Sequence, residues 1–271
     1  MQSPKFPSAA VSFHSELKKR VNDYFASAGK QPTGNFKLWL KAIIIIAFFL
    51  AVYIHLVFLT PPVWLACIEC VLLGGLISAI GFNIMHDGAH GSFSKYPVVN
   101  KAASLTLGML GGSHFMWNVK HNIIHHAYTN IDGIDDDIDA KPFLRMASTQ
   151  KKYKMHKYQH LYFWLFYSLL YAFWIFFSDY KKYFTGKVGE MPLKKMKLKD
   201  HFYFWWYKVI SCFLLLVLPI ITVGIIPTLI GFLIAVLVAG FTLSIVFQLA
   251  HTVEHTQFPQ PQEHTGKMDD E

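Results

Sequence analysis

Two histidine clusters follow a long apolar segment of this chain. Residues 86–90 read HDGAH and residues 121–126 read HNIIHH. On a helix, residues four apart lie on one face about one turn apart, so His86 with His90 and His121 with His125 are predicted to form two pairs of converging imidazoles. Neutral imidazole binds zinc, iron, copper or nickel, whereas calcium and magnesium prefer oxygen ligands. One such pair alone is more often polar residues on a wet helix face, but two clusters on one side of an apolar segment indicate a transition-metal site.

The clusters and their surroundings resemble the first two histidine boxes of the membrane fatty acid desaturases. The stretches NIMHDGAHGSFS and WNVKHNIIHHAYTNIDGIDDD are similar to the bacterial branch that acts on acyl-CoA or acyl lipids, and the similarity extends over nearly the whole chain. The resemblance implies an oxygen-dependent fatty acyl desaturase that uses O2 and two iron ions. The implied iron ligands are His86, His90, His121, His125, His126 and His251.

The same resemblance implies substrates and partners. The substrate is a fatty acyl-CoA or an acyl lipid held in the membrane, and the electrons come from an external donor, a ferredoxin or a cytochrome b5-like protein, because the sequence has no nicotinamide or flavin fingerprint. In that family a third box, Gln or His followed by two residues and His-His, lies beyond the last membrane helix. No such motif occurs before Glu271. We therefore expect a chain that ends before the third box; a natural short form is the alternative, and activity of the chain alone stays open.

Three other functions remain as alternatives. A fatty acyl or lipid hydroxylase or ketolase uses related boxes and the same di-iron chemistry. An inactive fragment or a non-catalytic metal-binding membrane protein is the second. A metal transporter is the third, but its spans should carry polar ligands near mid-membrane, and the middle portions of the apolar segments here are almost wholly apolar.

The composition is that of a small integral membrane protein. The 271 residues are 53% hydrophobic and 16% aromatic, with a mean hydropathy of +0.32. The net charge of +8 comes from short lysine runs, which indicate membrane topology, and no motif indicates nucleic-acid binding. The cysteines, Cys67, Cys70 and Cys212, all lie in apolar segments, so no disulfide framework is expected.

We predict an all-α integral membrane protein with four transmembrane helices in two hairpins, cytosolic histidine-bearing helices and one re-entrant or interfacial aromatic helix. The single domain of residues 1–271 divides into a cytosolic N-terminal segment (1–38), a first hairpin (39–85), a cytosolic and interfacial histidine-box region (86–203), a second hairpin (204–249) and a cytosolic tail (250–271). Each hairpin has two apolar runs of roughly the 20 residues that a span needs, separated by a turn with proline.

The aromatic segment 161–177 is flanked by lysines on both sides, so the positive-inside rule places both of its ends in the cytoplasm. With four spans, the end of the last span reaches the side of the histidine clusters. That end carries His251 and His255, which are four apart and are predicted to share a helix face as further metal ligands; for His255, an exposed polar residue is the alternative.

Two further expectations concern acidic residues. One or two aspartates of the run 132–139, or Asp87, are predicted to accept hydrogen bonds from the non-ligating nitrogens of metal-bound histidines. In the first hairpin, His55 and Glu69 are predicted at matching depth, where they pair across the helix interface or each reach another polar group. Separate snorkelling to the headgroups is the alternative.

Overall fold

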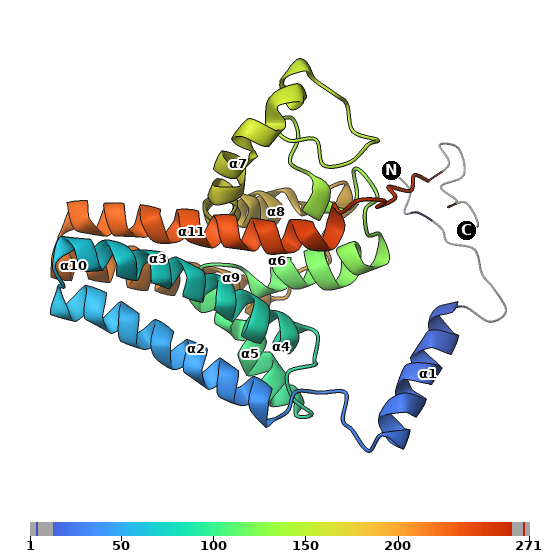
Figure 1. Ribbon diagram of the computed structural model, residues 1–271, viewed down its shortest axis with the longest axis horizontal. Coiled ribbons are helices and arrows are strands. Elements are labelled where there is room, and N and C mark those ends of the chain that lie inside the picture. The colour runs from blue at the N-terminus through green and yellow to red at the C-terminus, as the bar shows by residue number, and fades with distance from the viewer. Residues whose placement is uncertain (1–3, 5–12, 262–267, 269–271) are drawn as a thin grey trace.

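The structure is a computed structural model that describes residue 4, residues 13–261 and residue 268. It is mostly helical (Figure 1). The α-helices are α1 (Phe13–Ser27), α2 (Phe36–Ile54), α3 (Val63–Ile80), α4 (Asp87–Ala89), α5 (Pro97–Met109), α6 (His114–Asn118), α7 (Gln159–Phe173), α8 (Asp179–Thr185), α9 (Leu198–Cys212), α10 (Leu218–Val223) and α11 (Ile225–His251). The π-helical turns are η1 (His55–Leu59), η2 (Gly81–His86), η3 (Val119–His125), η6 (Trp174–Ser178) and η7 (Phe213–Val217), and the 3-10 turns are η4 (Asp136–Ile138) and η5 (Lys154–Tyr158).

The first predicted hairpin is present. Helix α2 begins at Phe36 rather than Trp39, because the Asn35 side chain accepts hydrogen bonds from two backbone amides of the first turn. It continues through η1 to Leu59, and α3 starts directly after Pro62. The two helices pack side by side along the long axis of the molecule (Figure 1).

The predicted pairing of His55 with Glu69 across this hairpin is confirmed. His55 Nδ1 lies 2.7 Å from Glu69 Oε1. The Glu69 side chain is mostly buried, so the pair supplies the partner that a carboxylate inside a span requires. The alternative of separate snorkelling is therefore wrong.

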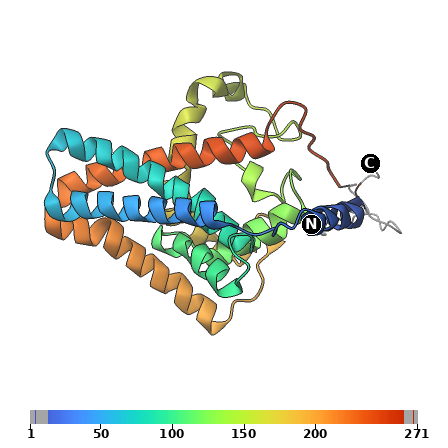
Figure 2. The same ribbon diagram turned by 60° about the horizontal axis from the view of Figure 1, so that its bottom comes forward.

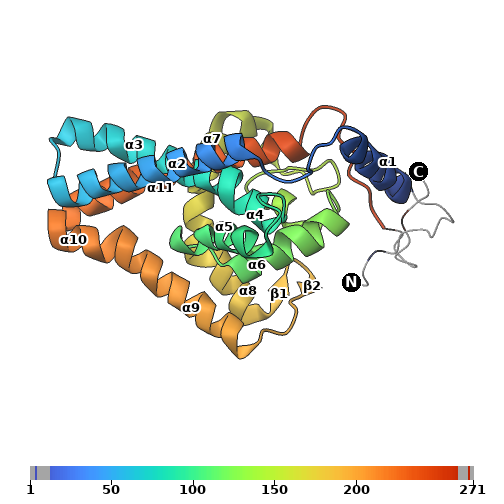
Figure 3. The same ribbon diagram turned by 90° about the horizontal axis from the view of Figure 1, so that it is seen from below.

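The second predicted hairpin is also present. It comprises α9, η7 and α10 on one side and α11 on the other, with a turn at Gly224, whose φ of +94° suits glycine. The turns of both hairpins lie at one end of the molecule, and the histidine-bearing helices lie toward the other (Figures 1 and 3). The Tyr53 hydroxyl donates a hydrogen bond to the Leu214 carbonyl and so joins the two hairpins.

Among the described residues, five continuous helical segments are long and apolar enough to cross a membrane. Four are the spans of the two predicted hairpins, and the fifth is the aromatic segment; their bounds are Phe36–Leu59, Val63–Ala89, Lys154–Thr185, Leu198–Val223 and Ile225–Ala250. The chain is thus an all-α protein of the multi-pass membrane class.

The aromatic segment forms α7, which crosses α11 at a steep angle in all three views (Figures 1, 2 and 3). The crossing is close because Gly240 has no side chain; a Cβ there would collide with the Ser168 carbonyl. Ser244 Oγ also donates to the Tyr167 carbonyl at 3.0 Å, and the Trp164 and Phe241 rings stack at 5.5 Å. These contacts fix α7 across α11.

A buried ion pair that the sequence did not indicate anchors α9. Lys208 Nζ lies 2.9 Å from Asp179 Oδ2 and donates to the carbonyls of Gly111 and Ile175 at 2.7 and 2.8 Å, so all three of its protons have acceptors. The same carboxylate oxygen accepts the backbone amide of Ser113 at 2.7 Å. This network attaches α9 and α8 to the loop that starts the second histidine-bearing helix.

Two small elements lie outside this core. Helix α1 lies in the N-terminal segment; none of its side chains is buried, and it stands apart from the rest (Figures 1 and 2). The strands β1 (Lys187–Val188) and β2 (Met191–Pro192) pair antiparallel between α8 and α9, a short hairpin that the all-α prediction did not include.

Candidate metal centre

Both histidine clusters lie on helices that widen into π-helical turns. Helix α3 continues through η2 and α4, so His86 and His90 extend from its end. Helix α6 continues through η3, which carries His121 and His125. Single π-helical turns inside α-helices occur frequently at functional sites, because the wider turn changes where successive side chains point.

The structure brings all five histidines of the two clusters together. His86 Nε2 lies 3.2 Å from both His90 Nε2 and His121 Nε2. The His126 ring centroid is 4.8 Å from that of His90, and the His125 ring stacks on His121 at 5.1 Å with an interplanar angle of 11°. The site is therefore formed by the two helices together and not by either alone.

The spacing of the Nε2 atoms fits a shared metal ion. Imidazole nitrogens bound to one transition-metal ion at about 2.1 Å are roughly 3.0–3.4 Å apart in octahedral or tetrahedral geometry. The observed separations of 3.2 Å fall within this range. All-nitrogen donors of this kind suit iron, zinc or copper.

The Nδ1 side of the second pair faces carboxylates. His125 Nδ1 lies 3.0 Å from both carboxylate oxygens of Asp135, which is almost fully buried, and 3.4 Å from Asp137 Oδ2. His121 Nδ1 lies 3.7 Å from the same oxygen of Asp137. Carboxylates in this position fix the tautomer and ring orientation of metal-bound histidines.

The expectation that one or two aspartates of the acidic run orient the histidines agrees with the contact of Asp135. Its carboxylate also accepts the backbone amides of Asn130 and Asp137, at 2.8 and 3.0 Å, so it is held in place from several directions. The alternative residue, Asp87, comes no closer than 3.9 Å to His86 Nδ1 and makes no hydrogen bond to it. His121, His125 and Asp137 are themselves close enough to hold an ion. The Nδ1 atoms of the two histidines already face carboxylates, however, so we assign Asp137 to orientation of the rings rather than to ligation.

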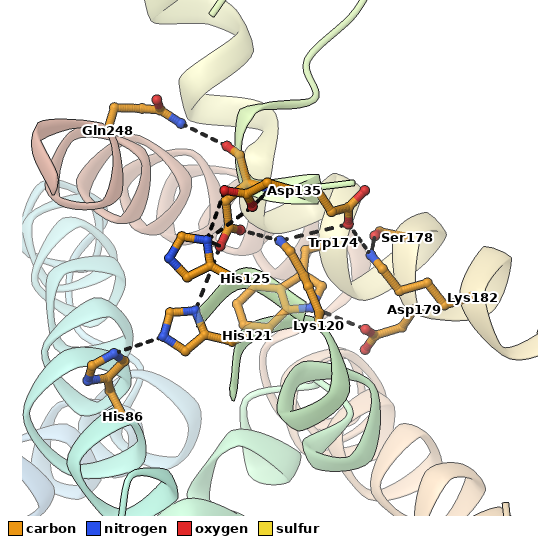
Figure 4. A network of polar contacts seen from close by, with 12 residues as sticks. His86, Lys120, His121, His125, Asp135, Trp174, Ser178, Asp179, Lys182 and Gln248 are labelled. Carbon is orange, nitrogen blue, oxygen red and sulfur yellow. Dashed lines mark hydrogen bonds and ion pairs between the residues drawn. The ribbon is translucent and has the colours of Figure 1, made fainter. Parts of the chain in front are cut away.

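Two lysines that the sequence analysis did not single out hold the acidic run in place (Figure 4). Lys120 Nζ lies 2.6 Å from Asp137 Oδ1 and 3.9 Å from Asp136 Oδ2. Lys182 Nζ, from α8, lies 2.9 Å from Asp136 Oδ2 and donates to Ser178 Oγ at 2.5 Å. The sequence offered one signal for these ion pairs: Lys120 is a cation directly before His121 and is close in sequence to the acidic run.

The end of α11 and a tryptophan complete the surroundings. Gln248 Nε2 donates to the Asp137 carbonyl at 3.3 Å, so the last helix contacts the acidic run (Figure 4). The buried Trp117 ring stacks on His121 at 4.5 Å. Trp117, His121 and His125 follow one another at intervals of four residues along one face of the helix, with the tryptophan at its N-terminal end.

The electrostatics favour neutral histidines on the Nε2 side. Burial, together with His86 and the neighbouring His126 and His125, lowers the pKa of His90 to about 4. Burial also lowers the pKa values of His121 and His126. These imidazoles are therefore uncharged near pH 7, the form that binds metals.

On the carboxylate side of the site, the pKa shifts favour charged groups. Burial opposes the charged form of His125, but its contacts with Asp135 outweigh burial and raise the pKa. Burial likewise opposes ionisation of Asp137, and the Lys120 ammonium overcomes it and holds the pKa of that carboxyl well below its usual range. The carboxylate is therefore ionised, and its Oδ2 atom lies 3.4 Å from His125 Nδ1 and 3.7 Å from His121 Nδ1.

The predictions for the two C-terminal histidines, His251 and His255, have different outcomes. Helix α11 ends at His251, whose side chain lies outside the described part of the structure. The expectation that His255 shares a helix face with it is wrong, because Thr252 caps the helix and His255 has a φ of +68°. The His255 side chain is 91% exposed and lies beside Glu254, so the structure does not bring it to the clusters.

Comparison with known proteins identifies similar sequences. Residues 62–269 match the family model described as fatty acid desaturase. The chain is 32% identical to an sn-1 linoleoyl-lipid 6-desaturase of Arthrospira platensis over 93% of its own length and 69% of that protein. It is 32% identical to an acyl-lipid (8-3)-desaturase of Physcomitrium patens, over 92% of the chain and 53% of that protein. It is 29% identical to an sn-1 linoleoyl-lipid 6-desaturase of a Synechocystis strain, over 96% of the chain and 72% of that protein.

Proposed function

The chain belongs to the fatty acid desaturase family, and we propose that it acts as an oxygen-dependent acyl-lipid desaturase, which introduces a double bond into the acyl chain of a membrane lipid. The observation that carries this proposal is the convergence of five histidines from two separate helical segments on one site. The names of the similar cyanobacterial and moss proteins favour an acyl lipid over acyl-CoA as substrate.

We assign the metal ligands to His86, His90, His121, His125, His126 and His251, and we propose that they hold two iron ions. The first five have the donor chemistry for such ions, and the Nε2 atoms of His86, His90 and His121 have the spacing. His251 is retained because it ends α11, one turn beyond Gln248, which contacts the acidic run. His255 is omitted because its side chain is exposed.

The bound iron supplies the oxidising power, with O2, to remove two hydrogens from an unactivated methylene. The protein residues orient and insulate the site. Asp135 and Asp137 hold the His125 and His121 rings, and Lys120 holds the Asp137 carboxylate. Trp117 covers His121 on one side. Two electrons come from an external donor of the ferredoxin or cytochrome b5 type, for which we propose docking on the cytosolic face.

We propose four membrane spans, with α7 lying within or along the cytosolic half of the bilayer. This proposal is supported by the steep crossing of α7 over α11 and by the lysines at both ends of the aromatic segment (Figure 1). Four spans place the two hairpin turns on the outer side and the histidine site on the cytoplasmic side.

The activity is tested by lipid analysis. The chain is expressed in a bacterial host with a ferredoxin system and fed linoleate, and the fatty acids of the membrane lipids are analysed by mass spectrometry. We expect a new double bond with the natural chain and none with the His125→Ala variant at equal protein level. A hydroxylated product, or the same product with both chains, would contradict the proposal.

A further inference from the structure

A pocket separate from the histidine site lies between α5, α6 and α9. Its volume is about 210 Å³. Lys101 of α5, His114 and Asn118 of α6, and Lys199 and Tyr203 of α9 line it. It combines aromatic walls with cationic and hydrogen-bonding groups, the composition of a site for a small polar anion.

The aromatic wall depends on a glycine. The Tyr207 ring lies directly against Gly108, where any Cβ would overlap the ring. Tyr203, one turn earlier on α9, stacks with Tyr207 at a ring-centroid distance of 6.3 Å. The pocket thus has a defined floor of tyrosine rings between two helices.

The ammonium groups of two lysines and one ring nitrogen of His114 have no polar partner among the described residues. Neither Lys101 Nζ nor Lys199 Nζ forms a hydrogen bond or an ion pair with any residue that the structure describes. The carboxylate in the pocket lining, that of Asp200, accepts the backbone amide of Lys197 at 2.8 Å. His114 Nδ1 is buried and has no hydrogen-bond partner among the described residues. Burial first, and Lys101 second, lower the pKa of His114, so the ring is neutral near pH 7 and still has an N–H to donate.

We propose that this pocket binds the phosphate of an anionic glycerophospholipid. Under the four-span topology, the start of α9 at Leu198 lies at the cytosolic boundary of the membrane, where lipid headgroups are found. Basic pockets between helices at this level bind anionic headgroups, since each lysine attracts the phosphate and the apolar part of the lipid stays in the bilayer. The volume is too small for a whole lipid and suits a headgroup.

The pocket lies close to the metal centre along one helix. His114 and Asn118 precede His121 by seven and three residues, which corresponds to roughly 10 and 5 Å along the axis. A lipid held by its phosphate here presents its acyl chain near the histidines. This second statement rests on the proposed desaturase activity, whereas phosphate binding rests only on the proposed four-span topology.

The test measures lipid binding, not turnover. The purified full chain in neutral detergent is titrated with phosphatidylglycerol, with an uncharged galactolipid and with inorganic phosphate, and bound lipid is counted by native mass spectrometry. The pocket variant is Lys101→Gln with Lys199→Gln. The matched control is Lys151→Gln with Lys152→Gln, which removes the same charge from exposed positions elsewhere. Leu105→Trp narrows the pocket without changing charge, and thermal unfolding verifies that each variant is folded.

We expect the natural chain to prefer phosphatidylglycerol to the galactolipid. The pocket variant should lose affinity by roughly fivefold for each lysine, and the control variant should lose little. Leu105→Trp should weaken binding as well. Equal losses in both double variants would show general surface attraction and overturn the proposal, as would equal binding of both lipids or displacement of the lipid by millimolar inorganic phosphate. Binding with the expected pattern in a chain that forms no double bond would leave this proposal standing and remove only the desaturase activity.

Discussion

Lys120 Nζ lies 2.6 Å from Asp137 Oδ1, and the other oxygen of that carboxylate faces the ring nitrogens of His121 and His125. The lysine comes directly before the second histidine cluster, and the aspartate comes from the loop that follows it. The pair therefore closes the segment 120–137 on itself and holds the carboxylate that faces both histidine rings.

Replacing Lys120 by methionine should weaken metal binding without removing a ligand. The change leaves two carboxylates near the histidines with only Lys182 to balance them, so the acidic run should shift away from the rings. Loss of such an orienting contact typically lowers metal affinity by about 10–100-fold. The iron that stays bound during dialysis against increasing chelator concentrations measures the effect. The Lys120→Arg variant, which keeps the positive charge, should retain most of its iron. Equal iron affinity in the methionine variant would contradict this role.

Asp135→Asn tests the contact on His125. The amide keeps the size of the side chain but removes the negative charge, so the His125 ring loses its fixed orientation. We expect a comparable loss of iron affinity. The control is Asp139→Asn, an exposed aspartate with no histidine contact in the described structure. If both variants bind iron equally well, Asp135 does not orient the site.

The His55–Glu69 pair should show coupled energetics. Glu69 Oε2 is buried and has no hydrogen-bond partner in the described residues, so the carboxylate depends on His55. Each single change, His55→Leu or Glu69→Leu, should lower the free energy of unfolding by about 1–3 kcal/mol, because the remaining group is left unpaired. The double variant should cost less than the sum. Unfolding in detergent measures the cycle, and strictly additive losses would show that the pair does not act together.

The proposed topology predicts that both ends of α7 are on one side of the membrane. After replacement of Cys67, Cys70 and Cys212 by alanine, single cysteines at positions 151 and 181 should react with a membrane-impermeant reagent only when the cytoplasmic face is accessible. A cysteine at position 61, in the turn of the first hairpin, should react from the opposite face. Labelling of positions 151 and 181 from different sides would show that α7 crosses the membrane.

Local signals predicted much of this architecture. The prolines 61 and 62, which cannot continue a helix, and Gly224 separated the apolar runs, and the i, i+4 spacing of histidines indicated the converging pairs. The pairing of His55 with Glu69 followed from their equal distance to the turn. These features depend on neighbours along the chain, so they are visible in the sequence.

Features that depend on distant contacts were not visible. Lys120 finds Asp137 only when the acidic loop folds back, and Lys208 finds Asp179 from another helix, so neither pair has a periodic signal. The π-helical turns that carry the histidines have no sequence signature comparable to a cap. The prediction for His255 failed because it assumed that the helix continued past His251, where the backbone turns instead.

The central claim is that the converging histidines hold iron. The direct measurement is the iron content per chain, by mass spectrometry of the metal, in the natural chain and in a variant with His125→Ala and His126→Ala. The matched control is His156→Ala with His160→Ala, two described histidines outside the clusters. We predict about two iron ions per chain in the natural protein and in the control, as proposed for this site, and little iron in the cluster variant. Unchanged iron content in the cluster variant would contradict the account.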